Sequence, residues 1–184
     1  MTDALRPRRA AIAAWALIAV AAVSGCRSAG EAVPDTITIG GQGVGARLGP
    51  VGGSAMIGAV TFTQRDGHVA VLANLGNASP GREYRVVVHA TGNCTSPNGF
   101  SAGPPWTPPG VTPDPRRVLV TTNTEGTGLV SARLPGWRVE GPDGIRGRSV
   151  VIHEGAIGSL EAEPGVRNNR MACGVIGQMK GITL

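Results

Sequence analysis

The chain has 184 residues, of which 41% are hydrophobic, 29 are glycine and 14 are proline, and its formal net charge is +5. This length allows one domain with a sizeable core and is short for two, and so much glycine and proline favours short strands joined by turns. The basic residues are scattered and no aromatic ladder accompanies them, so we expect no nucleic-acid partner.

Residues 1–25 have the pattern of a signal peptide. A basic segment, 1–9, precedes an apolar run at 10–23, which is shorter than the roughly 20 residues needed to span a bilayer. Residues 23–26, VSGC, resemble the bacterial lipobox, whose cysteine is lipidated and becomes the new N-terminus. We therefore expect export, with Cys26 anchoring the protein to a membrane of the cell envelope on its extracytoplasmic side. The alternative is an ordinary signal peptide that ends by chance at a cysteine.

Two further features concern the processed protein that begins at Cys26. Removal of the first 25 residues leaves 14 basic and 11 acidic residues, a formal net charge of +3. Arg27 rather than an aspartate follows the cysteine. By resemblance to lipoprotein sorting, this predicts the outer membrane in an envelope that has two membranes.

The rest of the chain predicts an all-β domain. Residues 26–55 are expected to form the lipidated N-terminus and a Gly/Ala-rich tether with one early strand at 36–39, and residues 56–184 the folded domain. Asp66-Gly67 predicts a hairpin turn, after which alternate residues from Val69 to Leu75 share one face. Segments bounded by Gly, Pro or Asn predict the strands, at 57–63, 68–75, 83–90, 117–122, 128–134 and 147–153. This spacing favours a Greek-key sandwich or barrel, and no segment after residue 26 predicts a helix.

Export also determines how the other cysteines are interpreted. With Cys26 assigned to lipid, Cys94 and Cys173 are an even pair in an oxidising compartment, where a disulfide is the usual outcome. A disulfide between these two cysteines would close a loop that spans 79 positions. In the chain-entropy model, closing such a loop stabilises the fold by about 4 to 5 kcal/mol. Two free buried thiols are the alternative.

Three segments together resemble the Cu/Zn superoxide dismutase family. HATGNCTSPNGFSAGPPWTP (89–108) is similar to the family pattern H-x-H-x-x-G-x-C followed by S-A-G-x-H-F-N-P. GRSVVIHEG (147–155) and RMACGVIGQ (170–178) are similar to G-R-S-V-V-x-H and R-x-A-C-G-V-I. The resemblance covers residues 56–178 and is to a bacterial lipoprotein form. It implies an eight-stranded Greek-key β-barrel and matches Cys94 and Cys173 to the family's internal disulfide.

The resemblance implies a degenerate copper site. In the family, four histidines hold copper, and one of them bridges to zinc. His89 and His153 match two of these ligands, whereas Val87 stands at a third position, on the same face of the strand as His89. Pro105 stands at the bridging position and offers no donor atom. The two remaining histidines predict at most one weakly held copper, and neither ring is expected to be needed to fill the core.

The zinc side is poorer still. Only Asp114 matches a zinc ligand, and one carboxylate cannot form a tetrahedral site, so no zinc is expected. His68 follows the hairpin turn and is predicted to be a solvated residue at a strand end. Arg170 matches the family arginine that guides superoxide, and its alternative role is a surface ion pair near the disulfide.

Two functions follow. The first is an exported, membrane-tethered lipoprotein that keeps the family's barrel without dismutase activity and serves a structural or binding role. The alternative is a copper-binding protein or copper-only dismutase that uses His89 and His153. The sequence leaves open which function is correct, and it identifies no protein or ligand partner.

Overall fold

The structure, a computed structural model, describes residues 44–114, 118–155 and 169–179. The expected signal peptide, the lipidation site Cys26 and the early strand at 36–39 lie outside these residues. In the described part of the chain, no helix is long and apolar enough to cross a membrane.

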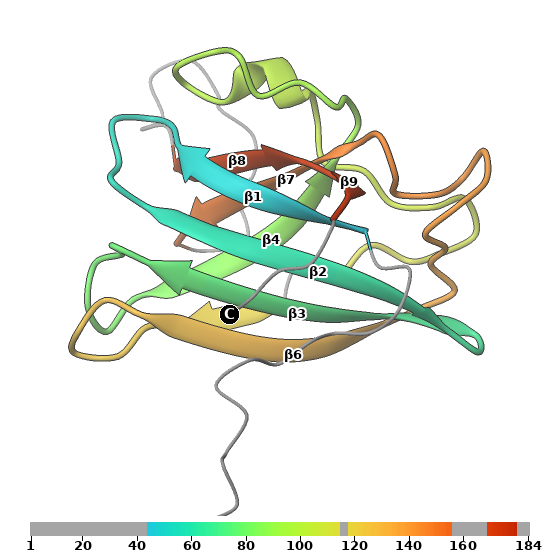
Figure 1. Cartoon of the computed structure of the whole chain (residues 1–184), viewed down its shortest axis with the longest axis horizontal. Coiled ribbons are helices and arrows are strands. Elements are labelled where there is room, and N and C mark those ends of the chain that lie inside the picture. Colours follow the sequence, from blue (N-terminus) through green and yellow to red (C-terminus); the bar gives the residue numbers. More distant parts are fainter. Residues whose placement is uncertain (1–43, 115–117, 156–168, 180–184) are drawn as a thin grey trace, which may run out of the picture. The chain divides into compact units, whose positions relative to one another are not determined.

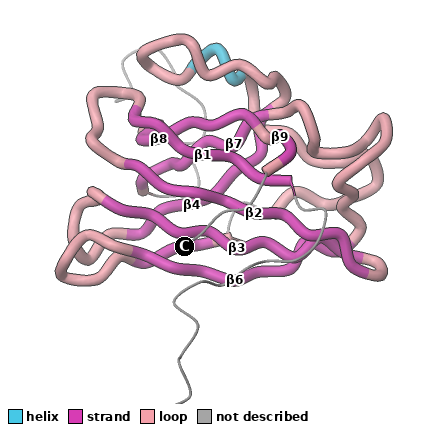
Figure 2. The backbone as a smooth tube through the Cα atoms, viewed as in Figure 1, coloured by secondary structure: helices cyan, strands magenta, loops and turns pink. Residues whose placement is uncertain are grey.

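The described residues form nine strands and one short helical turn, so the predicted all-β class is confirmed (Figure 2). The elements, most of them labelled in Figure 1, are β1 (Val44–Pro50), β2 (Ile57–Arg65), β3 (His68–Gly76), β4 (Glu83–His89), η1 (Phe100–Ala102), β5 (Leu119–Thr121), β6 (Gly128–Pro135), β7 (Ser149–Glu154), β8 (Arg170–Val175) and β9 (Gly177–Gln178). Each of the six segments predicted at 57–153 overlaps one of these strands.

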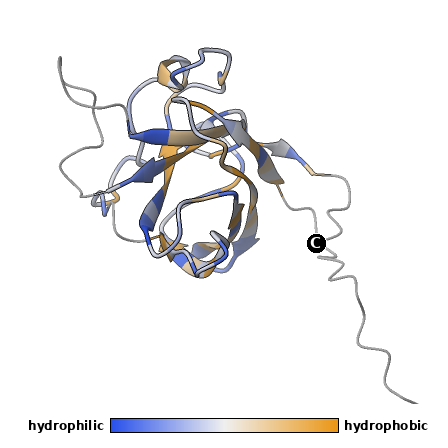
Figure 3. Ribbon diagram, turned by 90° about the vertical axis from the view of Figure 1, so that its left-hand side faces the viewer, coloured by the Kyte–Doolittle hydropathy of each residue, from blue (hydrophilic) through white to orange (hydrophobic). Residues whose placement is uncertain are grey.

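The strands form one antiparallel and nearly closed barrel around a shared core (Figure 3). Their order is β5-β4-β7-β8-β1-β2-β3-β6, with β9 paired to β1, and β5 and β6 contact each other across the remaining seam. Strands β4, β5 and β6 follow one another, and the chain then returns to place β7 beside β4. This return is a Greek-key connection, as predicted.

Strand β1 corrects the expected boundary of the tether. Residues 44–50 were assigned to the tether, but they pair with β2 and, at Gly49 and Pro50, with β8. The side chains of Val44, Ala46 and Leu48 are buried because they alternate toward the core. The sequence contains this alternation, but the glycines around it favour a tether over a strand.

The β2–β3 hairpin forms where the sequence predicts it. Gly67 has φ 70°, which suits a tight turn, and Arg65 pairs with His68 across it. The inward residues of β3, from Val69 to Leu75, are fully buried, which confirms the predicted core face.

A second, smaller apolar cluster lies under the loop that follows β4. It contains Val51, Ala102, Val151 and Cys173, with Cys94 packed against it. The Cys94–Cys173 disulfide is confirmed, with 5.7 Å between the two Cα atoms. It attaches this loop to β8.

Candidate metal centre

His89 and His153 meet on the outer face of the barrel, beneath the loop that follows β4. Strands β4 and β7 are antiparallel neighbours, and the Val87–Val151 pair lies between the two histidines in the register. Both side chains are fully buried, and their Nε2 atoms are 3.0 Å apart. The rings are therefore packed beneath this loop, on the outer face and not in the barrel interior, and that neither is needed to fill the core stays a prediction.

The partners of the two Nδ1 atoms determine where the ring protons lie. Nδ1 of His89 is 2.7 Å from the carbonyl oxygen of Gly103, which can only accept, so this nitrogen carries the proton. Nδ1 of His153 is 3.1 Å from Oδ1 of Asn169, whose Nδ2 donates to the carbonyl of Glu154. That second bond fixes the amide with its oxygen toward the imidazole, so Nδ1 of His153 is also the donor.

Both Nε2 atoms of the neutral rings therefore carry lone pairs that face each other. Two lone pairs at 3.0 Å repel unless a proton or a metal cation lies between them. An Nδ1–H donated to a carbonyl, with Nε2 left free, is the usual arrangement of a histidine that binds a metal.

Protonation is disfavoured in this position. Burial, which outweighs the Gly103 hydrogen bond, lowers the pKa of His89 from 6.5 to about 4, and Arg170 adds to the shift. Burial, followed by the charge of His89, lowers the pKa of His153 from 6.5 to about 3. The pair is thus uncharged at neutral pH, which is the state in which imidazole binds metals.

Arg170 is buried, with 6% of its surface exposed, and supports the loop above the histidines. Its Nη1 donates to the carbonyls of Gly99, at 2.9 Å, and Gly103, at 3.3 Å, and its Nη2 also donates to Gly103. The guanidinium carbon lies 5.0 Å from the ring centroid of Phe100. The side chain is therefore buried and does not lie at the surface.

Gly103 is the shared acceptor of the site. Its carbonyl receives hydrogen bonds from both His89 and Arg170. Its φ of +74° is favoured by glycine and turns the carbonyl toward these donors. Neither Gly103 nor Asn169 was predicted as part of the site, because a backbone carbonyl and an isolated asparagine leave no motif in the sequence.

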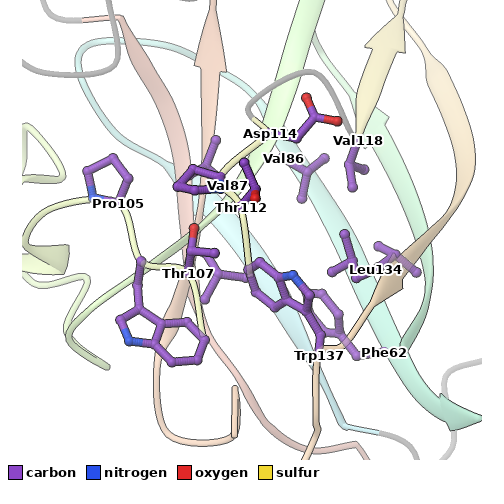
Figure 4. Close-up of a pocket in the computed structure, with 14 residues that line it drawn as sticks. Phe62, Val86, Val87, Pro105, Thr107, Thr112, Asp114, Val118, Leu134 and Trp137 are labelled. Carbon is purple, nitrogen blue, oxygen red and sulfur yellow. The ribbon is translucent and has the colours of Figure 1, made fainter. Parts of the chain in front are cut away.

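The two positions that lack a metal ligand lie next to the histidines. Val87 is between them in the register, and Pro105 forms an isolated bridge with His89. Both residues line a cavity of about 170 Å³ (Figure 4). The space next to the imidazoles is thus apolar on this side.

The remaining predicted site residues do not complete a metal centre. Asp114 is exposed and lines the same cavity, and His68 is at the start of β3, with Nδ1 3.0 Å from the carbonyl oxygen of Asp66. Among residues 44–114, 118–155 and 169–179, no group of three or more His, Cys, Asp or Glu side chains could hold a metal ion. A dinuclear copper–zinc centre does not fit this set, whereas a single metal ion facing two Nε2 atoms does.

The fold and the site together define a Greek-key barrel with a buried histidine pair. Residues 56–176 match the family described as copper/zinc superoxide dismutase (SODC). The chain belongs to this family.

Proposed function

We propose that this chain is an exported, lipid-anchored member of the superoxide dismutase family that does not dismutate superoxide. The observation that carries the proposal is the replacement of two family ligands by Val87 and Pro105, directly beside the remaining histidines. Dismutation requires copper to be held through both oxidation states, and two nitrogens do not specify such a geometry. Signal-peptide and lipobox patterns in residues 1–26 support the anchored, extracytoplasmic location.

A second candidate function is the binding of one copper ion by His89 and His153. The facing Nε2 lone pairs favour it, because a metal ion would relieve their repulsion without protonating a buried ring. Copper(II) binds imidazole nitrogen most strongly among the common divalent metals. The ion would supply redox chemistry when bound, and this chain's residues would hold and orient it through Gly103 and Asn169.

One set of measurements tests both candidates. The full chain is loaded with copper, dialysed, and assayed for bound copper and zinc and for dismutase rate. We expect no zinc, at most one copper that a chelator removes, and a rate equal to that of free copper.

Variants separate the two candidates. His89→Asn keeps a donor near the Gly103 carbonyl but removes Nε2, so copper binding should be lost, whereas His68→Asn, a matched control, should retain it. Copper bound equally by both variants would contradict the histidine site. A rate typical of the family that is lost in His89→Asn and Arg170→Ala would contradict the proposal that the chain is inactive.

A further inference from the structure

The cavity that Val87 and Pro105 line reaches core side chains of the barrel (Figure 4). Its floor is formed by buried side chains of β2, β3 and β6, which are Phe62, Val71 and Leu134. Half-buried Val87 and Pro105 line it on the side of the histidine pair, and the exposed residues 112–114 also line it. This largely apolar space is therefore partly open to the surface.

Two tryptophans form the walls and are already held in position. The rings of Trp106 and Trp137 meet edge to face, with centroids 5.6 Å apart. The Arg148 guanidinium carbon lies 3.6 Å from the Trp106 ring centroid, and Arg148 in turn donates to the carbonyls of Gly144 and Ala90. Walls that are fixed before binding reduce the ordering cost that a ligand must overcome.

From this geometry we propose that the cavity binds a small planar aromatic molecule of one or two fused rings. An engineered cavity of about 150 Å³ lined by Leu, Ile and Phe binds benzene, and this cavity of about 170 Å³ has a comparable lining. Larger cofactors would not fit, because pockets for drug-sized ligands enclose about 300 to 1,000 Å³. Aromatic rings pack favourably against Trp edges and faces.

The polar groups of the cavity restrict the ligand further. Polar side-chain oxygens come from Thr107, Thr112 and Asp114, and Trp106 and Trp137 carry indole N–H groups, while the floor is hydrocarbon. These oxygens can accept a hydrogen bond from one ring N–H, and nothing deep in the cavity could compensate for burying a charged group. The ligand class is therefore an uncharged aromatic ring with at most one polar group, which can hydrogen-bond to the threonine hydroxyls. This inference goes beyond the proposed function and does not depend on it.

The replaced metal-ligand positions contribute directly to the cavity. Val87 and Pro105 both line it, so the residues that remove nitrogen donors also supply apolar wall.

The test uses the unprocessed chain, which keeps residues 1–25 and therefore Trp15, in detergent. It is labelled with 5-fluorotryptophan and titrated with indole while ¹⁹F NMR is recorded. The three tryptophan signals, from Trp15, Trp106 and Trp137, are assigned by single Trp→Phe substitutions. We expect saturable shifts of the Trp106 and Trp137 signals and no saturable shift of the Trp15 signal. Shifts that grow linearly in all three signals would indicate partitioning into detergent and would overturn the proposal.

Variants whose larger side chains fill the cavity provide a second test of the binding site. Val87→Phe should weaken indole binding at least tenfold, whereas Val175→Phe, the same change at an exposed position of β8 outside the lining, should leave it unchanged. If Val87→Phe does not fold, Val86→Phe replaces it, since Val86 also lines the cavity. Equal saturation in the cavity variants and in Val175→Phe would overturn the site even if the wild-type chain binds indole.

Discussion

Acidification of the metal-free protein should destabilise the fold through the buried histidine pair. Both rings have a folded-state pKa below the ordinary value of 6.5, about 4 for His89 and about 3 for His153. The unfolded chain therefore binds protons first as the pH falls. Stability is fully present above pH 6.5 and decreases as the pH falls from 6.5 toward these folded-state values.

The magnitude follows from the linkage between proton binding and folding. Each histidine that titrates only in the unfolded chain contributes at most about 1.4 kcal/mol per pH unit. Between pH 6.5 and about 5, above the ordinary carboxyl range, each ring would contribute up to about 2 kcal/mol. Since both rings shift in the same direction, a loss of about 2 to 4 kcal/mol is expected across this window.

Urea unfolding followed by tryptophan fluorescence, in the presence of a chelator, measures this loss at pH values from about 8 to about 5. The double variant His89→Asn/His153→Asn should remove most of the slope, and His68→Asn serves as the control for removing a histidine as such. A wild-type stability that stays flat or rises as the pH falls would refute the reasoning. It would mean that the two Nε2 atoms share a proton in the folded state.

Three further changes have expected outcomes. Cys94→Ser should lower the free energy of unfolding by about 2 to 5 kcal/mol, measured by denaturant titration; an unchanged stability would show that the bond to Cys173 adds nothing. Arg170→Lys should cost about 2 kcal/mol, because a single ammonium cannot reproduce the forked hydrogen bonds to two carbonyls; thermal unfolding equal to wild type would contradict this. Cys26→Ser should abolish incorporation of radiolabelled fatty acid, and label retained by this variant would exclude the lipid anchor.

The sequence predicts the fold well because its signals are local. The Asp66-Gly67 turn and the alternation that follows it determine the β2–β3 hairpin within a short segment. The disulfide was predictable from cysteine number and compartment. Strand β1 was missed, although Val44, Ala46 and Leu48 alternate, because glycine-rich composition outweighed a short period-two pattern.

The site was only partly predictable because its chemistry depends on contacts between distant segments. Motif matching brings His89 and His153 together, but their proton positions depend on a carbonyl at Gly103 and an amide at Asn169. The cavity depends on Trp106 and Trp137, which are 31 residues apart in the sequence. The spacing of apolar residues along the chain does not predict a contact between two side chains so far apart in the sequence.

The double pairing of β1 has a mechanical consequence for a protein held at its N-terminus. If Cys26 carries the lipid, any pull between membrane and domain arrives at Val44, the first residue of this strand. Val44 is paired with Phe62 of β2 on one side and with Gln178 of β9 on the other. Farther along, Gly49 and Pro50 are paired with β8. Detaching this strand from the barrel would therefore require breaking its hydrogen bonds to β2, β8 and β9.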